Sequence, residues 1–191
     1  MKMEEFDATK HFAKLLASGQ FKVEKDGRIL IEGINIVAMP ALTLAKLWKE
    51  VPPEILYEAG KYQAQKAVEV HTKYFGFTKS VIPKLLSGIM DKVIEFSMST
   101  YSAVSGLGQF QIQKYDKEKK EILIVNKTNI IARCYFRDFG KSDKPIDHFL
   151  VGLFEGMANT MGVNVKCVES KCIACGDEAC IFIIKEVGDN R

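Results

Sequence analysis

The stretch CVESKCIACGDEAC, residues 167–180, contains four of the five cysteines of the chain. It lies between two segments with alternating apolar residues, VNVKCVES before it and ACIFIIKEV after it, which is typical of two β-strands joined by a loop. Gly176 and Asp177 favour a turn in the middle of this loop. A strand–loop–strand unit of this kind brings Cys172 and Cys180 together. The sequence therefore predicts a C-terminal β-hairpin with two facing sulfur atoms.

Clustered cysteines outside a secretory context indicate a metal site or free thiols before they indicate disulfides. Zinc takes four tetrahedral ligands from thiolate, imidazole and carboxylate groups, often with two of them in one tight loop. Cys172 and Cys180 are the first two candidates, and Glu169 lies three residues before Cys172 on the incoming strand. A fourth ligand from another element would tie the hairpin to the rest of the fold. We therefore predict zinc as the cofactor.

Three other interpretations of the cysteines remain open at this stage. All four cysteines of the loop, Cys167, Cys172, Cys175 and Cys180, could form a thiolate-only site. Cys172 and Cys175 also form a CxxC pair, but a redox dithiol of that type opens a helix, whereas Gly-Asp follows here. The fifth cysteine, Cys134, lies in the apolar run NIIARCYF, which we interpret as a strand, so it is expected to be a small buried hydrophobic residue.

The rest of the chain alternates long helical patterns with strand patterns, which predicts an α+β fold with an antiparallel sheet packed against long helices. Gly152 and Gly156 lie on one face of the last predicted helix, so another element can approach closely there. The expected helices are 4–16, 41–51, 54–76, 80–104 and 146–162, and the expected strands are two in 20–33, one at 34–39, and those at 109–113, 121–126, 129–136, 163–170 and 179–187.

The composition argues against several classes of function. The net charge of +3 in 191 residues is too small to indicate a nucleic-acid partner, and neither terminus has a basic tail. No apolar run approaches the roughly 20 residues that cross a bilayer, and the first residues include acids where a signal peptide needs an apolar stretch. We therefore expect a cytoplasmic protein with neither a nucleic-acid nor a membrane partner.

The cysteine loop resembles the vinyl-4-reductase domain family. The similarity rests on the pattern E-x-x-C, seven residues and C, with a glycine in the loop and Cys180-Ile-Phe182-Ile after it. ILYEAGKYQA after a proline turn and the Gly-x-x-x-Gly helix FLVGLFEGMANTMG agree with the family as well. The resemblance covers about residues 28–187. It implies a small-molecule-binding domain over 36–191, with residues 1–35 as an N-terminal helix and hairpin that belongs to it or is loosely attached.

The resemblance also implies the ligands of the zinc ion. In related sensor proteins they are the glutamate and the two cysteines that correspond to Glu169, Cys172 and Cys180. The fourth ligand is a cysteine in those sensors, and its position falls on Asp147 here, with His148 beside it. Position favours Asp147, whereas neutral imidazole is the commoner zinc ligand and favours His148. Cys167 and Cys175 remain as substitutes.

The function that the resemblance implies is the binding of a small hydrophobic or aromatic ligand, as a sensor or carrier and as a homodimer. An apolar pocket between helices and sheet is expected. One alternative is a reductase that acts on a vinyl or tetrapyrrole substrate, although no GxGxxG motif or paired catalytic group supports an enzyme. Another is an assembly protein similar in fold to the vesicle-tethering (TRAPP) subunits. Candidate pocket residues are Trp48, Tyr57, Tyr62, Phe96, Tyr101 and Phe110.

Overall fold

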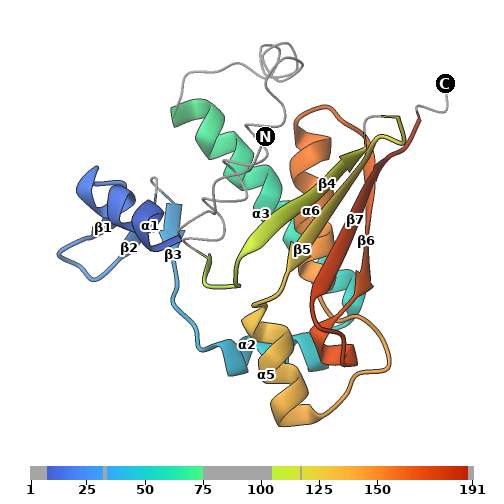
Figure 1. Ribbon diagram of the computed structural model, residues 1–191. Coiled ribbons are helices and arrows are strands. Elements are labelled where there is room, and N and C mark those ends of the chain that lie inside the picture. The colour runs from blue at the N-terminus through green and yellow to red at the C-terminus, as the bar shows by residue number, and fades with distance from the viewer. Residues whose placement is uncertain (1–7, 32–33, 75–104, 117, 189–191) are drawn as a thin grey trace.

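A computed structural model describes residues 8–31, 34–74, 105–116 and 118–188 (Figure 1). It has two antiparallel sheets and several helices, which confirms the mixed α+β class. The helix predicted over residues 80–104 lies outside the described residues. The elements are α1 (Ala8–Ala17), β1 (Phe21–Val23), β2 (Ile29–Ile31), β3 (Ile34–Ile36), α2 (Ala41–Glu50), α3 (Pro53–Tyr74), β4 (Phe110–Asp116), β5 (Glu121–Asn126), α5 (Ile130–Phe139), α6 (His148–Thr160), β6 (Val165–Lys171), the 3-10 helix η1 (Ile173–Cys175) and β7 (Cys180–Glu186).

The larger sheet has the strand order β4-β5-β7-β6, and every neighbouring pair in it is antiparallel. The C-terminal hairpin that the cysteine loop predicted is the β6–β7 pair. The segment 129–136, however, is not a third strand of a meander. The place beside β5 is taken by β7, which arrives from the far end of the sequence, with Ile124 opposite Phe182.

Residues 130–139 form helix α5, so the strand predicted for NIIARCYF is wrong. The Asn129 side chain caps the helix by accepting a hydrogen bond from the Ala132 N–H at 3.1 Å. Gly140 ends the helix with a φ of 81°, a conformation that glycine adopts without strain. The isoleucine and aromatic residues of this segment favoured a strand, but the helix buries Ile131 and Cys134, three residues apart, on one face. Cys134 is thus buried, as expected, but on a helix.

Helix α6 lies directly against one face of the larger sheet, and α3 lies against α6 (Figure 1). The Phe154 ring of α6 contacts the rings of Phe110 and Phe182 edge-on, with centroid distances of 5.8 and 5.1 Å. The contact between the two helices depends on glycine, because a Cβ on Gly152 would lie 1.9 Å from the Tyr57 carbonyl oxygen. A Cβ on Gly156 would lie 2.9 Å from the Ala64 Cβ, so the close approach predicted for these two glycines is confirmed.

A second, smaller set of contacts closes one end of the sheet. Helices α2 and α5 pack against each other, with the Lys49 ammonium 4.6 Å from the centroid of the Phe139 ring. The Trp48 ring of α2 also reaches Phe149 at the start of α6, with a centroid distance of 5.4 Å. The beginning of α6 is therefore held from two sides, by α2 and by α3.

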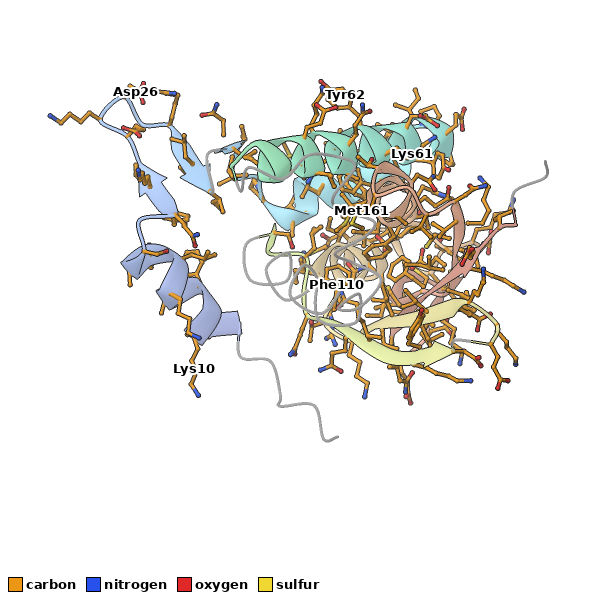
Figure 2. All side chains as sticks on the ribbon, turned by 90° about the horizontal axis from the view of Figure 1, so that it is seen from above. Lys10, Asp26, Lys61, Tyr62, Phe110 and Met161 are labelled. Atoms are coloured by element: carbon orange, nitrogen blue, oxygen red, sulfur yellow. The ribbon has the colours of Figure 1, made fainter. Side chains whose placement is uncertain are left out.

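The N-terminal elements form a separate group. Strands β1, β2 and β3 pair in a three-stranded antiparallel sheet of their own, which includes the hairpin predicted around Asp26. Both views draw α1 and this sheet to one side of the larger sheet, with Lys10 and Asp26 far from Phe110 (Figures 1 and 2). None of the described helices has the length and apolar character that crossing a membrane requires.

Candidate metal centre

Four side chains converge at the end of the larger sheet where β7 begins. The ligand atoms of Asp147, Glu169, Cys172 and Cys180 all lie within 4.8 Å of one another. Among the described residues this is the one group of three or more His, Cys, Asp or Glu side chains that meets in this way. The residues come from four different elements, so the group joins parts of the chain that lie far apart in sequence.

Local backbone geometry sets the position of each of the four residues. Asp147 stands at the N-cap position of α6, Glu169 lies on β6, and Cys180 is the first residue of β7. Cys172 stands directly before η1, and its carbonyl oxygen accepts the N–H groups of Cys175 and Asp177. The Asp177 carboxylate in turn accepts the Cys172 N–H at 2.9 Å. Because Gly176 has a φ of 87°, the loop can turn sharply and return Cys180 to Cys172.

The two carboxylates are each half satisfied by protein hydrogen bonds. Asp147 Oδ2 accepts the side-chain amide of Asn129 at 2.6 Å, and Glu169 Oε2 accepts the backbone N–H of Asp147 at 2.9 Å. The other oxygen of each carboxylate, Asp147 Oδ1 and Glu169 Oε1, is buried and has no hydrogen-bond partner among the described residues. Buried acceptors without partners are costly, and a cation would satisfy both. The donor set therefore fits a metal ion, with one oxygen oriented by the protein and the other left free.

The two sulfur atoms have the spacing that one zinc ion would need. Cys172 Sγ and Cys180 Sγ are 4.0 Å apart. Two thiolates on a tetrahedral zinc with bonds of about 2.3 Å are about 3.8 Å apart. Cys180 Sγ also accepts the Ile173 N–H at 3.4 Å, a contact of the kind that supports a metal-bound thiolate. Both cysteines are fully buried.

The electrostatics of the group also favour a cation. Burial raises the pKa of Asp147, and the neighbouring Cys172 raises it further. Burial likewise raises the pKa of Glu169, with Asp147 as the next cause. A hydrogen bond from the Cys180 thiol lowers the pKa of Cys172 and raises that of Cys180. No lysine or arginine of the described residues forms an ion pair with either carboxylate. The group holds protons unless a metal ion displaces them.

The other predicted candidates lie elsewhere. His148 follows Asp147 but is not in the group; it is half-buried, and burial lowers its pKa, opposed by the charge of Glu54 on α3. Cys167 is buried among the apolar core residues of β6, where burial raises its pKa. Cys175 is half-buried in η1, and burial raises its pKa to about 11. The described arrangement thus brings Asp147, rather than His148, Cys167 or Cys175, to Glu169, Cys172 and Cys180.

Asn129 is a residue of this centre that the sequence analysis missed. Its side-chain nitrogen lies 2.6 Å from Asp147 Oδ2 and 3.5 Å from Cys180 Sγ, while its oxygen caps α5. A signal was present in the sequence, because an asparagine before an apolar run that ends at a glycine is typical of a capped helix. The strand interpretation of residues 129–136 concealed this signal.

A second buried carboxylate lies further along α6. Glu155 is 3% exposed, and its Oε1 accepts the Cys167 N–H at 2.8 Å. Its Oε2 accepts the Tyr57 hydroxyl of α3, and the Lys166 ammonium lies 3.5 Å from the same oxygen. Burial, together with the hydrogen bond to Glu155, raises the pKa of the Tyr57 hydroxyl. No local motif indicated this cluster, because Tyr57 and Glu155 are 98 residues apart.

The predicted pocket residues have different surroundings. Phe110 is buried in the core, whereas Tyr62 is 63% exposed, on the outer side of α3 in Figure 2. The Tyr57 hydroxyl is already used by Glu155. The indole N–H of Trp48 is buried and has no hydrogen-bond partner within the part of the chain that the structure describes. Phe96 and Tyr101 lie outside the described residues.

Three solved structures are similar to this chain. The phenol-responsive sensory domain of the transcription activator PoxR, solved with phenol, matches 96% of this chain and 92% of its own, with 14% identity and a TM-score of 0.71. A trafficking protein particle complex subunit 3 from Naegleria fowleri, covalently bound to palmitic acid, matches 78% and 95%, with 14% identity and a TM-score of 0.51. A vinyl-4-reductase family protein from Methanocaldococcus jannaschii matches 78% and 91%, with 18% identity and a TM-score of 0.40.

At these identities the likeness to the first two structures establishes the fold. No curated protein matches the sequence significantly. The family model of the vinyl-4-reductase domain matches residues 128–186. That segment contains Asn129, the β6–β7 hairpin and all four residues of the candidate metal centre. Through residues 128–186 the chain therefore belongs to the vinyl-4-reductase domain family, which confirms the resemblance found in its sequence.

Proposed function

We propose that this chain is a small-molecule-binding module whose C-terminal hairpin is fixed by one structural zinc ion. The ligands would be Asp147, Glu169, Cys172 and Cys180. The observation that carries this assignment is the pair of buried carboxylate oxygens without partners among the described residues, next to two sulfur atoms 4.0 Å apart. Zinc accepts such a mixed set of carboxylate and thiolate ligands. When bound, it would supply the positive charge that the group lacks.

The proposed role of zinc is structural rather than catalytic. Four protein ligands saturate a tetrahedral zinc ion, whereas a catalytic zinc keeps a position open for water or substrate. Cys172 and Cys180 are both fully buried, which supports a closed site. The ion would join the start of α6 to the β6–β7 hairpin. The alternative of a reductase therefore receives no support from this centre.

The proposed small molecule is hydrophobic or aromatic and carries one hydrogen-bond acceptor. The sensory domain of PoxR, which shares the fold, is described as phenol-responsive. In this chain the buried indole N–H of Trp48 lacks a partner among the described residues, and its ring packs on Phe149 at the start of α6. An oxygen atom of a bound ligand would satisfy this N–H within apolar surroundings. As a sensor or carrier, the module would respond to such a ligand.

Three further expectations belong to this proposal. We propose a homodimer, which exposed apolar side chains on α3, such as Ile55 at 57% exposure, would support. We propose that residues 36–191 form the binding domain and that residues 1–35 are an N-terminal attachment, consistent with the separate sheet of β1, β2 and β3. We also propose a cytoplasmic location, because free thiols persist there. Light scattering of the purified protein tests the first of these.

Native mass spectrometry with metal analysis tests the zinc assignment, and calorimetry with phenol tests the ligand class. We expect one zinc ion per chain and heat release on titration with phenol. Trp48→Phe, which removes the N–H and keeps an aromatic ring, should weaken phenol binding about 3- to 10-fold, the value of one hydrogen bond. Tyr62→Phe is the matched control on the exposed side of α3. A folded protein without zinc would overturn the metal assignment, and equal phenol binding by Trp48→Phe would overturn the role of Trp48.

A further inference from the structure

Asn129 is a fully buried side chain with all its hydrogen-bonding groups in use. It is 1% exposed and stands at the N-cap of α5. Its Oδ1 accepts the N–H of Ala132 at 3.1 Å, which fixes which end of the amide carries the oxygen. The amide nitrogen must therefore point away from α5. It points into the candidate metal centre.

Both hydrogens of that nitrogen have acceptors among the proposed ligands. One distance, from Nδ2 to Asp147 Oδ2, is 2.6 Å, and the other, from Nδ2 to Cys180 Sγ, is 3.5 Å. An amide NH₂ group has two donors, so one asparagine can hold a carboxylate and a thiolate at once. Asp147 makes no capping bond to its own helix α6, which leaves its orientation dependent on such outside contacts.

We propose that Asn129 is a positioning residue that orients two of the four metal ligands and couples the start of α5 to the occupancy of the metal site. The inference rests on the proposed zinc centre and adds a residue outside its four ligands. The Asn129 amide bridges the two, because its oxygen holds the first turn of α5 and its nitrogen holds Asp147 and Cys180. Hydrogen-bond partners of metal ligands typically change metal affinity by about 10- to 100-fold when they are removed.

Asn129→Ser separates the two roles of the residue. Serine is also a good N-cap, so it can still accept the Ala132 N–H, but it has no amide to donate to Asp147 and Cys180. Asn159→Ser is the matched control, because Asn159 also bonds a backbone N–H, that of Val165 at 3.1 Å, and contacts none of the four ligands. Both variants lose one asparagine side chain, but only one of them changes the surroundings of the metal site.

Cobalt(II) is a suitable probe, because its absorption reports on thiolate ligands directly. In competition with a chelator, Asn129→Ser should bind Co²⁺ about 10- to 100-fold more weakly than the wild type. Its sulfur-to-metal charge-transfer band should move to longer wavelength, because Cys180 Sγ loses a hydrogen bond. Asn159→Ser should keep both the affinity and the band. A purely structural role of Asn129 would lower stability without moving the band.

Amide hydrogen exchange tests the coupling to α5. In the wild type, Zn²⁺ should slow exchange of the Ala132 N–H and its neighbours, and in Asn129→Ser this protection should be lost although the cap remains. Unchanged Co²⁺ affinity and spectrum in Asn129→Ser overturn the inference, as does metal-independent exchange at Ala132 in the wild type. A wild-type protein that takes up neither Co²⁺ nor Zn²⁺ overturns the zinc proposal itself, so the two failures are distinguishable.

Discussion

The two buried carboxylate clusters along α6 differ in one respect that decides their chemistry. Both oxygens of Glu155 have partners within the protein, from the Cys167 N–H, the Tyr57 hydroxyl and Lys166. At the other cluster, Asp147 and Glu169 each leave one buried oxygen without a partner among the described residues. A saturated carboxylate is a finished structural contact, whereas an unsaturated pair beside two sulfur atoms requires a cation. Burial alone therefore does not identify a metal site; the unsatisfied oxygen of the buried group does.

The largest expected effect comes from removing a sulfur ligand. Cys172→Ser and Cys180→Ser should each weaken zinc binding by more than about 100-fold, beyond the range of an outer hydrogen bond, and should lower the melting temperature sharply. Cys134→Ser, at a buried cysteine of α5, should leave the zinc content unchanged. Metal analysis and thermal unfolding measure both. Equal losses in Cys167→Ser and Cys175→Ser would indicate a thiolate-only site instead.

The second prediction contrasts the two carboxylate clusters directly. Glu155→Ala should lower the free energy of unfolding by about 2–5 kcal/mol, because the Tyr57 hydroxyl and the Cys167 N–H lose their acceptor, and zinc content should stay at one per chain. Glu169→Gln should do the reverse: zinc binding is lost, yet the metal-free protein becomes no less stable. Denaturant unfolding with and without a chelator separates the two outcomes. Loss of zinc in Glu155→Ala would remove the distinction between the clusters.

The third prediction concerns pH. Asp147 and Glu169 have raised pKa values in the metal-free protein, so the folded state binds their protons more tightly than the unfolded state does. The free energy of unfolding of the metal-free protein should therefore fall as the pH rises above about 4, by up to about 1.4 kcal/mol per pH unit for each proton. The stabilisation that zinc adds should grow over the same range, because zinc binds the deprotonated ligands. Denaturation series at pH values from about 4 to about 6 measure both slopes, and Glu169→Gln should flatten the first.

The smallest expected effect is at Lys166. Its ammonium lies 3.5 Å from Glu155 Oε2, but its side chain is 69% exposed. Water screens such a pair, so Lys166→Ala should cost only about 0–1 kcal/mol of unfolding free energy. The comparison with Glu155→Ala in the same assay shows whether the buried hydrogen bonds or the surface charge satisfy Glu155. A loss as large as that of Glu155→Ala would contradict this account.

Local sequence patterns predicted the parts of this molecule that local contacts build. The loop spacing identified Cys172 and Cys180, and the helix period placed Gly152 and Gly156 at a close helix contact. The segment 129–136 was misread because isoleucine and aromatic residues suit a strand, and tertiary packing with the Asn129 cap made it a helix. The Glu155 cluster had no such pattern, since it depends on how α3 crosses α6.

The choice between Asp147 and His148 shows the same limit. These neighbours differ by one helix position, and the sequence offered position for the first and ligand chemistry for the second. The arrangement of α6 decides which side chain faces the hairpin. Asp147, at the N-cap, points to Glu169, whereas His148, one residue later, lies near Glu54 of α3. Such a choice requires the rotation of a helix about its axis, which no short motif encodes.

The side chains of α6 also protect the outer strand of the sheet. Among the described strands, β6 pairs with β7 alone, so its other side carries backbone groups that a strand from a second molecule could bind. Two of its amides are already occupied, however: Glu155 accepts the N–H of Cys167, and Asn159 accepts that of Val165. A foreign strand would have to displace both. The same contacts that hold α6 to the sheet therefore guard the chain against edge-to-edge aggregation.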